Sequence, residues 1–196
     1  MSLLDDLSRH RTDDALEAEH LARILEFVAG HPAPFDRSTT GRHLTASAVV
    51  VSAQGERVLL VHHRKLDRWL QPGGHAAPGE SSGEIVALRE AIEESGLRGL
   101  ELHPVAPRPL DVDVHRIPAT AEGPAHDHLD LRYLLVAPAG ASVEACALET
   151  RGARWFTWDE LEEIGADLPM RRLFAKARRW VTGGSARVRA DSSASA

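Results

Sequence analysis

The sequence is short of the residues and patterns that mark several large classes of protein. Its 196 residues include one cysteine, Cys146, which excludes an internal disulfide framework and a zinc site built from several cysteines. No run approaches the roughly 18 apolar residues that suggest a membrane-spanning helix. The opening stretch, MSLLDDLSRH, is acidic where a secretory signal needs a basic region and then an apolar one. We therefore expect a soluble, cytoplasmic protein that does not contact a membrane.

Basic residues are also outnumbered. The chain has 23 Lys and Arg against 29 Asp and Glu, a net charge of −6 that argues against a general nucleic-acid-binding protein. A small anionic ligand stays compatible with this charge, because a bound metal ion can reverse the field within one cleft. With 43% hydrophobic and 27% charged residues, the composition is that of a globular protein long enough to bury one core.

Hydrophobic periodicity predicts helices near both ends and strands between them. Residues 13–29 repeat apolar side chains at helical spacing, and residues 45–52 and 57–63 are β-rich segments that predict a hairpin. A last helix is predicted from about Asp167 with its arginines in solvent, namely Arg171, Arg172, Arg178 and Arg179. We expect an N-terminal helical extension (residues 1–42), one domain (residues 43–182) and a disordered, polar tail (residues 183–196).

Two further predicted strands, residues 111–115 and 126–135, each have one polar face. In both, polar and apolar residues alternate, so every second side chain lies on the same face. These polar faces hold Asp111, Asp113, His115, His126, His128, Asp130 and Arg132. His126 and His128 could bind a metal or a phosphate, or could equally form the wet face of an antiparallel sheet.

The segment GGHAAPGESSGEIVALREAIEESGL (residues 73–97) reads as a loop followed by a short amphipathic helix. The helix is predicted from Ser82 to Ser95 and to end at Gly96, because glycine favours the left-handed conformation that follows many helices. Its apolar residues at helical spacing are expected to face the core, namely Ile85, Leu88 and Ile92.

Three glutamates fall together on the side of this helix opposite the apolar residues. At about 100° per residue, the carboxylates of Glu90, Glu93 and Glu94 can converge on one point outside the helix. Like charges at this spacing repel by roughly 0.2–0.5 kcal/mol per pair. A hard divalent cation such as Mg²⁺ or Mn²⁺, which prefers oxygen ligands, would offset that repulsion.

The whole arrangement resembles the signature of the Nudix hydrolase superfamily: Gly, five residues, Glu, seven residues, then Arg-Glu-apolar-x-Glu-Glu-x-Gly-apolar. Gly74 begins it, Glu80 follows at the right distance, and REAIEESGL (residues 89–97) completes it. One extra residue separates Glu80 from Arg89, and the loop around SSG is the natural place for it. The resemblance extends from about Thr45 to Val181 and implies an α/β fold, the Nudix α/β/α sandwich with a mixed β-sheet.

The resemblance implies a pyrophosphohydrolase that uses Mg²⁺, or alternatively Mn²⁺, to cleave a diphosphate linkage in a nucleoside diphosphate derivative or related nucleotide. It implies that Glu90, Glu93 and Glu94 are metal ligands and catalytic residues. The Gly73 carbonyl is a further candidate ligand, and the motif is supported by Gly74, Glu80, Arg89 and Gly96. The alternative is a non-catalytic Nudix-like module that binds or senses a nucleotide, which the complete set of glutamates disfavours.

Substrate contacts and the general base are expected outside the glutamates. Arg64 and Lys65 could hold outer phosphates, and His75 in the motif loop is a candidate substrate contact. In the superfamily a carboxylate or histidine outside the motif often completes the metal site or acts as base, and the candidates are Asp111, Asp113, His115, His126, His128, Asp130, Glu144 and Glu149. The expected partner is a small nucleotide whose identity the sequence leaves open, and the N-terminal helix is compatible with a homodimer.

Overall fold

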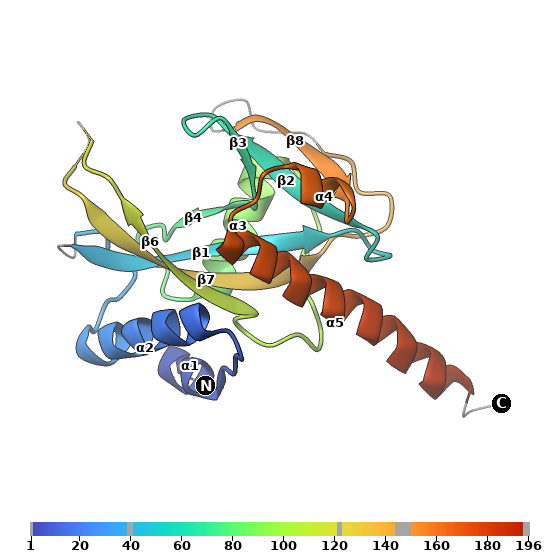
Figure 1. Ribbon diagram of the computed structural model, residues 1–196, viewed down its shortest axis with the longest axis horizontal. Coiled ribbons are helices and arrows are strands. Elements are labelled where there is room, and N and C mark those ends of the chain that lie inside the picture. Colours follow the sequence, from blue (N-terminus) through green and yellow to red (C-terminus); the bar gives the residue numbers. More distant parts are fainter. Residues whose placement is uncertain (1, 39–40, 121–122, 144–149, 194–196) are drawn as a thin grey trace.

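A computed structural model describes residues 2–38, 41–120, 123–143 and 150–193, with the backbone alone for residues 184–193. Figure 1 shows a β-sheet with helices packed around it. The helices are α1 (Leu3–Arg9), α2 (Ala15–Gly30), α3 (Gly83–Ser95), α4 (Glu160–Glu163) and α5 (Leu168–Ser193). The strands are β1 (Arg42–Val51), β2 (Arg57–His63), β3 (Arg68–Leu70), β4 (Gly73–His75), β5 (Glu101–Leu102), β6 (Asp111–Ile117), β7 (His126–Val136) and β8 (Thr150–Thr157). The division into extension, domain and tail stays a prediction.

The long strand β1 lies at the centre of the sheet. It runs parallel to β7 and antiparallel to β2 and β4, while β5 and β6 pair antiparallel with β7, and β3 and β8 with β2. The expected β1–β2 hairpin is therefore confirmed, and so is the mixed sheet. The parallel pairing sets His43 of β1 opposite His128 of β7, although 85 positions separate them in the sequence.

Two apolar cores lie on opposite faces of the sheet, because successive side chains of β1 point to opposite sides. Ala46, Ala48 and Val50 belong to one core, which α1, α2 and α3 cover. Val49 and Val51 belong to the other, which α4 and α5 cover. This arrangement confirms the expected α/β/α architecture. In the part of the chain that the structure describes, no helix combines the length and apolar character needed to cross a membrane.

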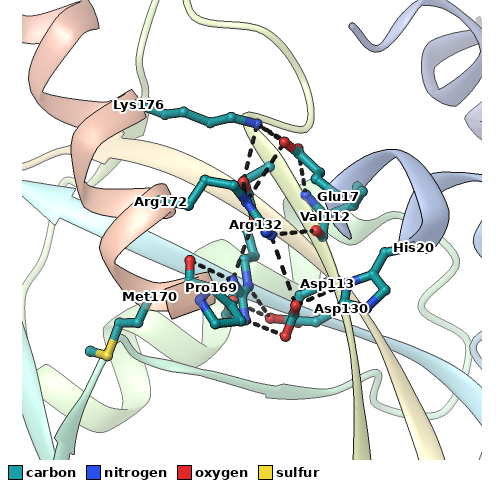
Figure 2. A network of polar contacts seen from close by, with 12 residues as sticks. Glu17, His20, Val112, Asp113, Asp130, Arg132, Pro169, Met170, Arg172 and Lys176 are labelled. Carbon is teal, nitrogen blue, oxygen red and sulfur yellow. Dashed lines mark hydrogen bonds and ion pairs between the residues drawn. The ribbon is translucent and has the colours of Figure 1, made fainter. Parts of the chain in front are cut away.

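A buried guanidinium, that of Arg132 on β7, organises the polar face of the sheet beneath α5. Its side chain contacts Asp113 at 2.8 Å, Asp130 at 3.1 Å and Asp111 at 3.4 Å. Figure 2 shows Asp113 of β6 and Asp130 of β7 beside Arg132. Arg132 is only 5% exposed, so this part of the polar face of β7 is buried. The charges can be buried because they neutralise one another.

The same network connects helices α2 and α5 to the sheet. Arg172 of α5 donates to the two oxygens of Asp111 at 2.8 and 3.0 Å, and Lys176 lies 3.0 Å from the same carboxylate. Glu17 of α2 accepts hydrogen bonds from Lys176 and lies 2.8 Å from the ring of His10. The expectation that Arg172 faces solvent is therefore wrong: α5 crosses charged strand residues at this point, and Arg172 turns toward them.

Candidate active site

The glycines of β4 lie directly against two glutamates of α3. The Gly73 N–H donates to Glu94 Oε2 at 3.0 Å. A Cβ at Gly74 would lie 2.7 Å from the carboxyl carbon of Glu90, so only glycine permits this approach. Glu90 and Glu94 are 9% and 7% exposed, which is unusual for carboxylates. Gly73 and Gly74 thus provide a close contact for the carboxylates of Glu94 and Glu90, and we call these two glycines the glycine cradle.

The face of α3 that packs on the sheet differs from the one its large apolar residues predict. Ile85 is 57% exposed, and Leu88 and Ile92 are only partly buried. The buried residues are Gly83, Val86, Ala87, Glu90, Ala91, Glu94 and Ser95. Small side chains and the space above the β4 glycines let α3 approach closely with its glutamates inward. The C-terminus is as predicted, since Gly96 ends the helix with φ 70°.

Arg89 connects α3 to the motif loop. Its Nε and Nη2 donate to the two oxygens of Glu80, each at 3.0 Å, and Nη2 also donates to the His75 carbonyl at 2.7 Å. Its Nη1 donates to Glu90 and Glu93, both at 2.9 Å. The hydrogen bonds with Glu80 raise the pKa of Arg89 and lower the pKa of Glu80. The extra residue between the two positions therefore does not prevent their contact.

The oxygen atoms around β4 fit a hard divalent cation. Glu90 and Glu94 lie one turn apart on α3 and both reach the backbone at Gly73 and Gly74. Donors of this kind, carboxylates and backbone carbonyls, are those that Mg²⁺ and Mn²⁺ prefer. Glu93 differs from the other two, because its side chain is 52% exposed and contacts Arg89. The residues present could thus hold such an ion, with Glu90 and Glu94 nearest the glycine cradle.

Five histidine rings gather where β1, β4, β6 and β7 lie side by side, and we call them the histidine cluster. His75 and His126 each place Nε2 close to Nε2 of His128, at 3.1 and 3.2 Å respectively. The rings of His43 and His115 lie 5.0 and 5.3 Å from that of His128. Sequence reasoning selected four of these residues and missed His43. Only the parallel register of β1 and β7 brings His43 to the others.

The histidines at the centre of this cluster are neutral near pH 7. Burial lowers the pKa of His43 to about 4, with a smaller effect from the neighbouring His126. Burial likewise lowers the pKa of His75 to about 4. For His128, burial and then the adjacent His75 lower the pKa to about 2. These rings therefore offer lone pairs and N–H groups rather than the positive charge that would attract a phosphate.

The other predicted site residues lie apart from the glycine cradle or have strong partners. Arg64 and Lys65 are exposed after the end of β2. Asp113 is buried: desolvation opposes its ionisation, but the hydrogen bond to His115 and the charge of Arg132 lower its pKa to about 2. Its role as a base stays a prediction. Glu144, Cys146 and Glu149 lie outside the described residues.

Comparison with known sequences identifies the family. A model of the NUDIX domain matches residues 41–177, which is most of the chain, so the protein belongs to the NUDIX domain family. It is similar to a Bacillus subtilis (strain 168) protein whose name proposes 8-oxo-dGTP diphosphatase activity, with 42% identity over 48 residues. That match spans 24% of this chain and 32% of the relative, so the chain corresponds to about a third of the relative's length.

Solved structures show the same fold. The chain is similar to a Caenorhabditis elegans Ap4A hydrolase in a binary complex, with a TM-score of 0.57 and 20% identity over 71% of this chain and 98% of that one. It is also similar to a NUDIX-family hydrolase of Clostridium perfringens, with a TM-score of 0.53 and 22% identity over 72% and 97% of the two chains. At 20 and 22% identity these neighbours show the fold, and the match over residues 41–177 shows the family.

Proposed function

We propose that this protein is a Mg²⁺-dependent hydrolase that cleaves a diphosphate linkage in a nucleoside diphosphate derivative or related nucleotide. The observation that carries the proposal is the cradle at Gly73 and Gly74, which receives two buried carboxylates, Glu94 and Glu90. Burying two like charges side by side is costly unless a cation or a donor compensates them. We also predict that the protein is cytoplasmic and that it forms a homodimer.

Glu90, Glu93 and Glu94 would hold the ion, with the Gly73 carbonyl as a backbone ligand. A bound divalent cation supplies polarisation of a phosphoryl oxygen and lowers the pKa of coordinated water. The chain's own contribution is to fix the carboxylates in advance. The Gly73 N–H orients Glu94, and Arg89 orients Glu90 while holding the loop through Glu80. Such preorganisation reduces the reorganisation that the reaction requires.

The substrate class follows from the same family relationship. The names of the similar proteins indicate nucleotides with a diphosphate linkage: one neighbour is an Ap4A hydrolase, and the Bacillus subtilis relative is named for 8-oxo-dGTP. Dinucleoside polyphosphates and oxidised nucleoside triphosphates therefore head the list of candidates, with ADP-ribose, NADH and CoA as further members of the class. His43 and His128 lie on the opposite face of the sheet and have lowered pKa values, so they carry no positive charge near pH 7 that would bind a substrate phosphate there.

The test is a panel assay on the purified full chain. Each candidate is incubated with Mg²⁺, with Mn²⁺ and with a chelator, and the products are analysed to identify the bond that is cut. We expect metal-dependent cleavage of one substrate class, and a fall of kcat/KM of at least about a hundredfold in Glu94→Gln. Glu84→Gln is the matched control, because Glu84 lies on the same helix outside the cradle and is expected to retain wild-type turnover.

The alternative, a binding or sensing module, predicts a different result. It would bind one of these nucleotides, as measured by calorimetry, without releasing any product under any metal condition. Equal turnover of wild-type protein and Glu94→Gln would instead remove Glu94 from the mechanism and overturn the account of the cradle.

A further inference from the structure

The histidine cluster has the composition and spacing of a metal-ligand set. One ring nitrogen from each of His43, His75 and His128 lies within 4.8 Å of the other two. The Nε2 atoms of His75 and His126 are closer still to that of His128, at 3.1 and 3.2 Å. Around a tetrahedral zinc ion with Zn–N distances of about 2.0–2.1 Å, ligand nitrogens lie about 3.3–3.4 Å apart. The two separations at His128 are within a few tenths of an ångström of that value, and the nitrogen of His43, within 4.8 Å of those of His75 and His128, would move closer to bind the same ion.

His43 has a buried nitrogen that nothing in the described chain satisfies. His43 is 4% exposed, and its Nε2 has no hydrogen-bond partner among the described residues. Buried ring nitrogens usually have a partner, since leaving one unsatisfied costs free energy. The ring of His43 lies 5.1 Å from that of His75 and 5.0 Å from that of His128. The unsatisfied nitrogen therefore belongs to a ring that lies against the two other rings of the set.

The hydrogen bond at His126 fixes which of its nitrogens faces the cluster. Its Nδ1 lies 2.9 Å from the carbonyl oxygen of Pro124, which can only accept. Nδ1 therefore carries a proton, and Nε2 is the nitrogen that faces His128. Histidines that bind metals commonly donate their second N–H to a backbone carbonyl in this way. Nε2 of His128 lies close to the Nε2 atoms of both His75 and His126. A single N–H cannot donate a well-aligned hydrogen bond to both.

From this geometry we propose that His43, His75 and His128, with His126 as a fourth ligand, form a site for Zn²⁺ or a similar divalent transition-metal ion. Imidazole ligands select such ions, whereas Mg²⁺ prefers oxygen. The site is separate from the glutamates of α3. Gly74 faces Glu90, and the next residue of β4, His75, points to the opposite face of the sheet.

The two centres nevertheless share one short strand. β4 contacts α3 through the Gly73 N–H and the face of Gly74, and it contacts the histidine cluster through the side chain of His75. An ion in the cluster would tie β4 to β1 and β7 by side-chain bonds in addition to the backbone ladder. The metal-binding measurement therefore includes variants from both centres.

The test measures zinc directly on the full chain. The protein is stripped with a chelator, loaded with Zn²⁺ in the presence of excess Mg²⁺, desalted and analysed for metal content, and its affinity is measured by calorimetry. We expect one Zn²⁺ per chain. His128→Gln and His75→Gln should each lower the affinity by more than about tenfold, the loss caused even by removing an outer partner of a ligand. His62→Gln, a half-buried histidine outside the cluster, should bind zinc as the wild type does.

A second measurement reports the coordination geometry of the bound ion in the wild-type protein, so it does not depend on the effect of a substitution on folding. Co²⁺ in place of Zn²⁺ in the wild-type protein should give the intense visible absorption of a tetrahedral site, rather than the weak absorption of an octahedral oxygen site. Glu94→Gln should leave zinc content and this spectrum unchanged. Loss of zinc in Glu94→Gln, displacement of zinc by Mg²⁺, or no zinc retained by the folded wild-type protein would each overturn the proposal.

Discussion

Adding one methyl group at Gly74 should impair the candidate active site while leaving the fold almost unchanged. The new Cβ would lie 2.7 Å from the carboxyl carbon of Glu90, whereas ordinary contact begins near 3.4 Å. Glu90 must therefore move by about 0.7 Å. Its carboxylate is the far end of a flexible side chain, so the movement costs little stability. A misplacement of about 1 Å in a catalytic group can cost a hundredfold in rate. We expect Gly74→Ala to lower kcat/KM between about tenfold and a hundredfold.

The neighbouring glycine provides the contrast, because its surroundings cannot move. A Cβ at Gly73 would lie 2.3 Å from Ser47 Cβ, 2.6 Å from Ser47 Cα and 2.8 Å from the Ala46 carbonyl oxygen. These atoms belong to β1, the central strand, so relief requires a backbone shift. Overpacking of this kind typically costs about 1–3 kcal/mol. Gly73→Ala should therefore lower the thermal midpoint by several degrees as well as lowering activity.

The assay pairs thermal unfolding, followed by circular dichroism, with kcat/KM on the substrate that the panel identifies. Gly74→Ala should keep a midpoint close to that of the wild type and lose turnover. Wild-type turnover in Gly74→Ala would refute the importance of Glu90's position. A loss of stability as large as that of Gly73→Ala would show that the methyl group is not relieved by the side chain.

Three further predictions concern the charged groups. Arg89→Lys keeps the charge but loses the bidentate contact with Glu80. We expect kcat/KM to fall at least about tenfold while the circular dichroism spectrum stays unchanged, and unchanged turnover would contradict this. Arg132→Met removes the guanidinium that contacts three buried carboxylates, of which Asp111 keeps its contacts with Arg172 and Lys176, and should cost about 3–5 kcal/mol, measured by denaturant unfolding. A loss below about 1 kcal/mol would indicate that the network relaxes. Asp113 has its pKa lowered to about 2 from 3.8, so its ionised form contributes stability that is complete above about pH 4 and is lost as the pH falls toward 2. Asp113→Asn should flatten that part of the stability profile, and an identical profile would argue against the ion pair.

Local patterns in the sequence were enough to predict several elements. Helical spacing in residues 13–29 corresponds to α2 (Ala15–Gly30), and the β-rich segments correspond to β1 and β2. Gly96 ends α3 as expected, because a left-handed residue after a helix is a local requirement that glycine meets. The spacing of Gly74, Glu80 and Arg89 indicated the family, which the match over residues 41–177 confirms. All of these signals lie within short stretches of chain.

Local sequence patterns did not predict which polar side chains are buried. Sequence reasoning placed Ile85 inward and Arg172 outward, since large apolar side chains are usually buried and charged ones exposed. Both expectations were wrong, because the partner of each helix decides its buried face. The β4 glycines leave room for Glu90 and Glu94, and the strand carboxylate Asp111 attracts Arg172.

The sequence alone thus determined the family, the glutamate motif and the main elements of the fold, because each depends on residues close together in the chain. The tertiary structure decided which side chains from distant segments meet. The histidine cluster exists only because β1 pairs in parallel with β7, which sets His43 opposite His128. No local spacing encodes that register. It results from burying both faces of a long central strand, a property of the whole sheet rather than of any one segment.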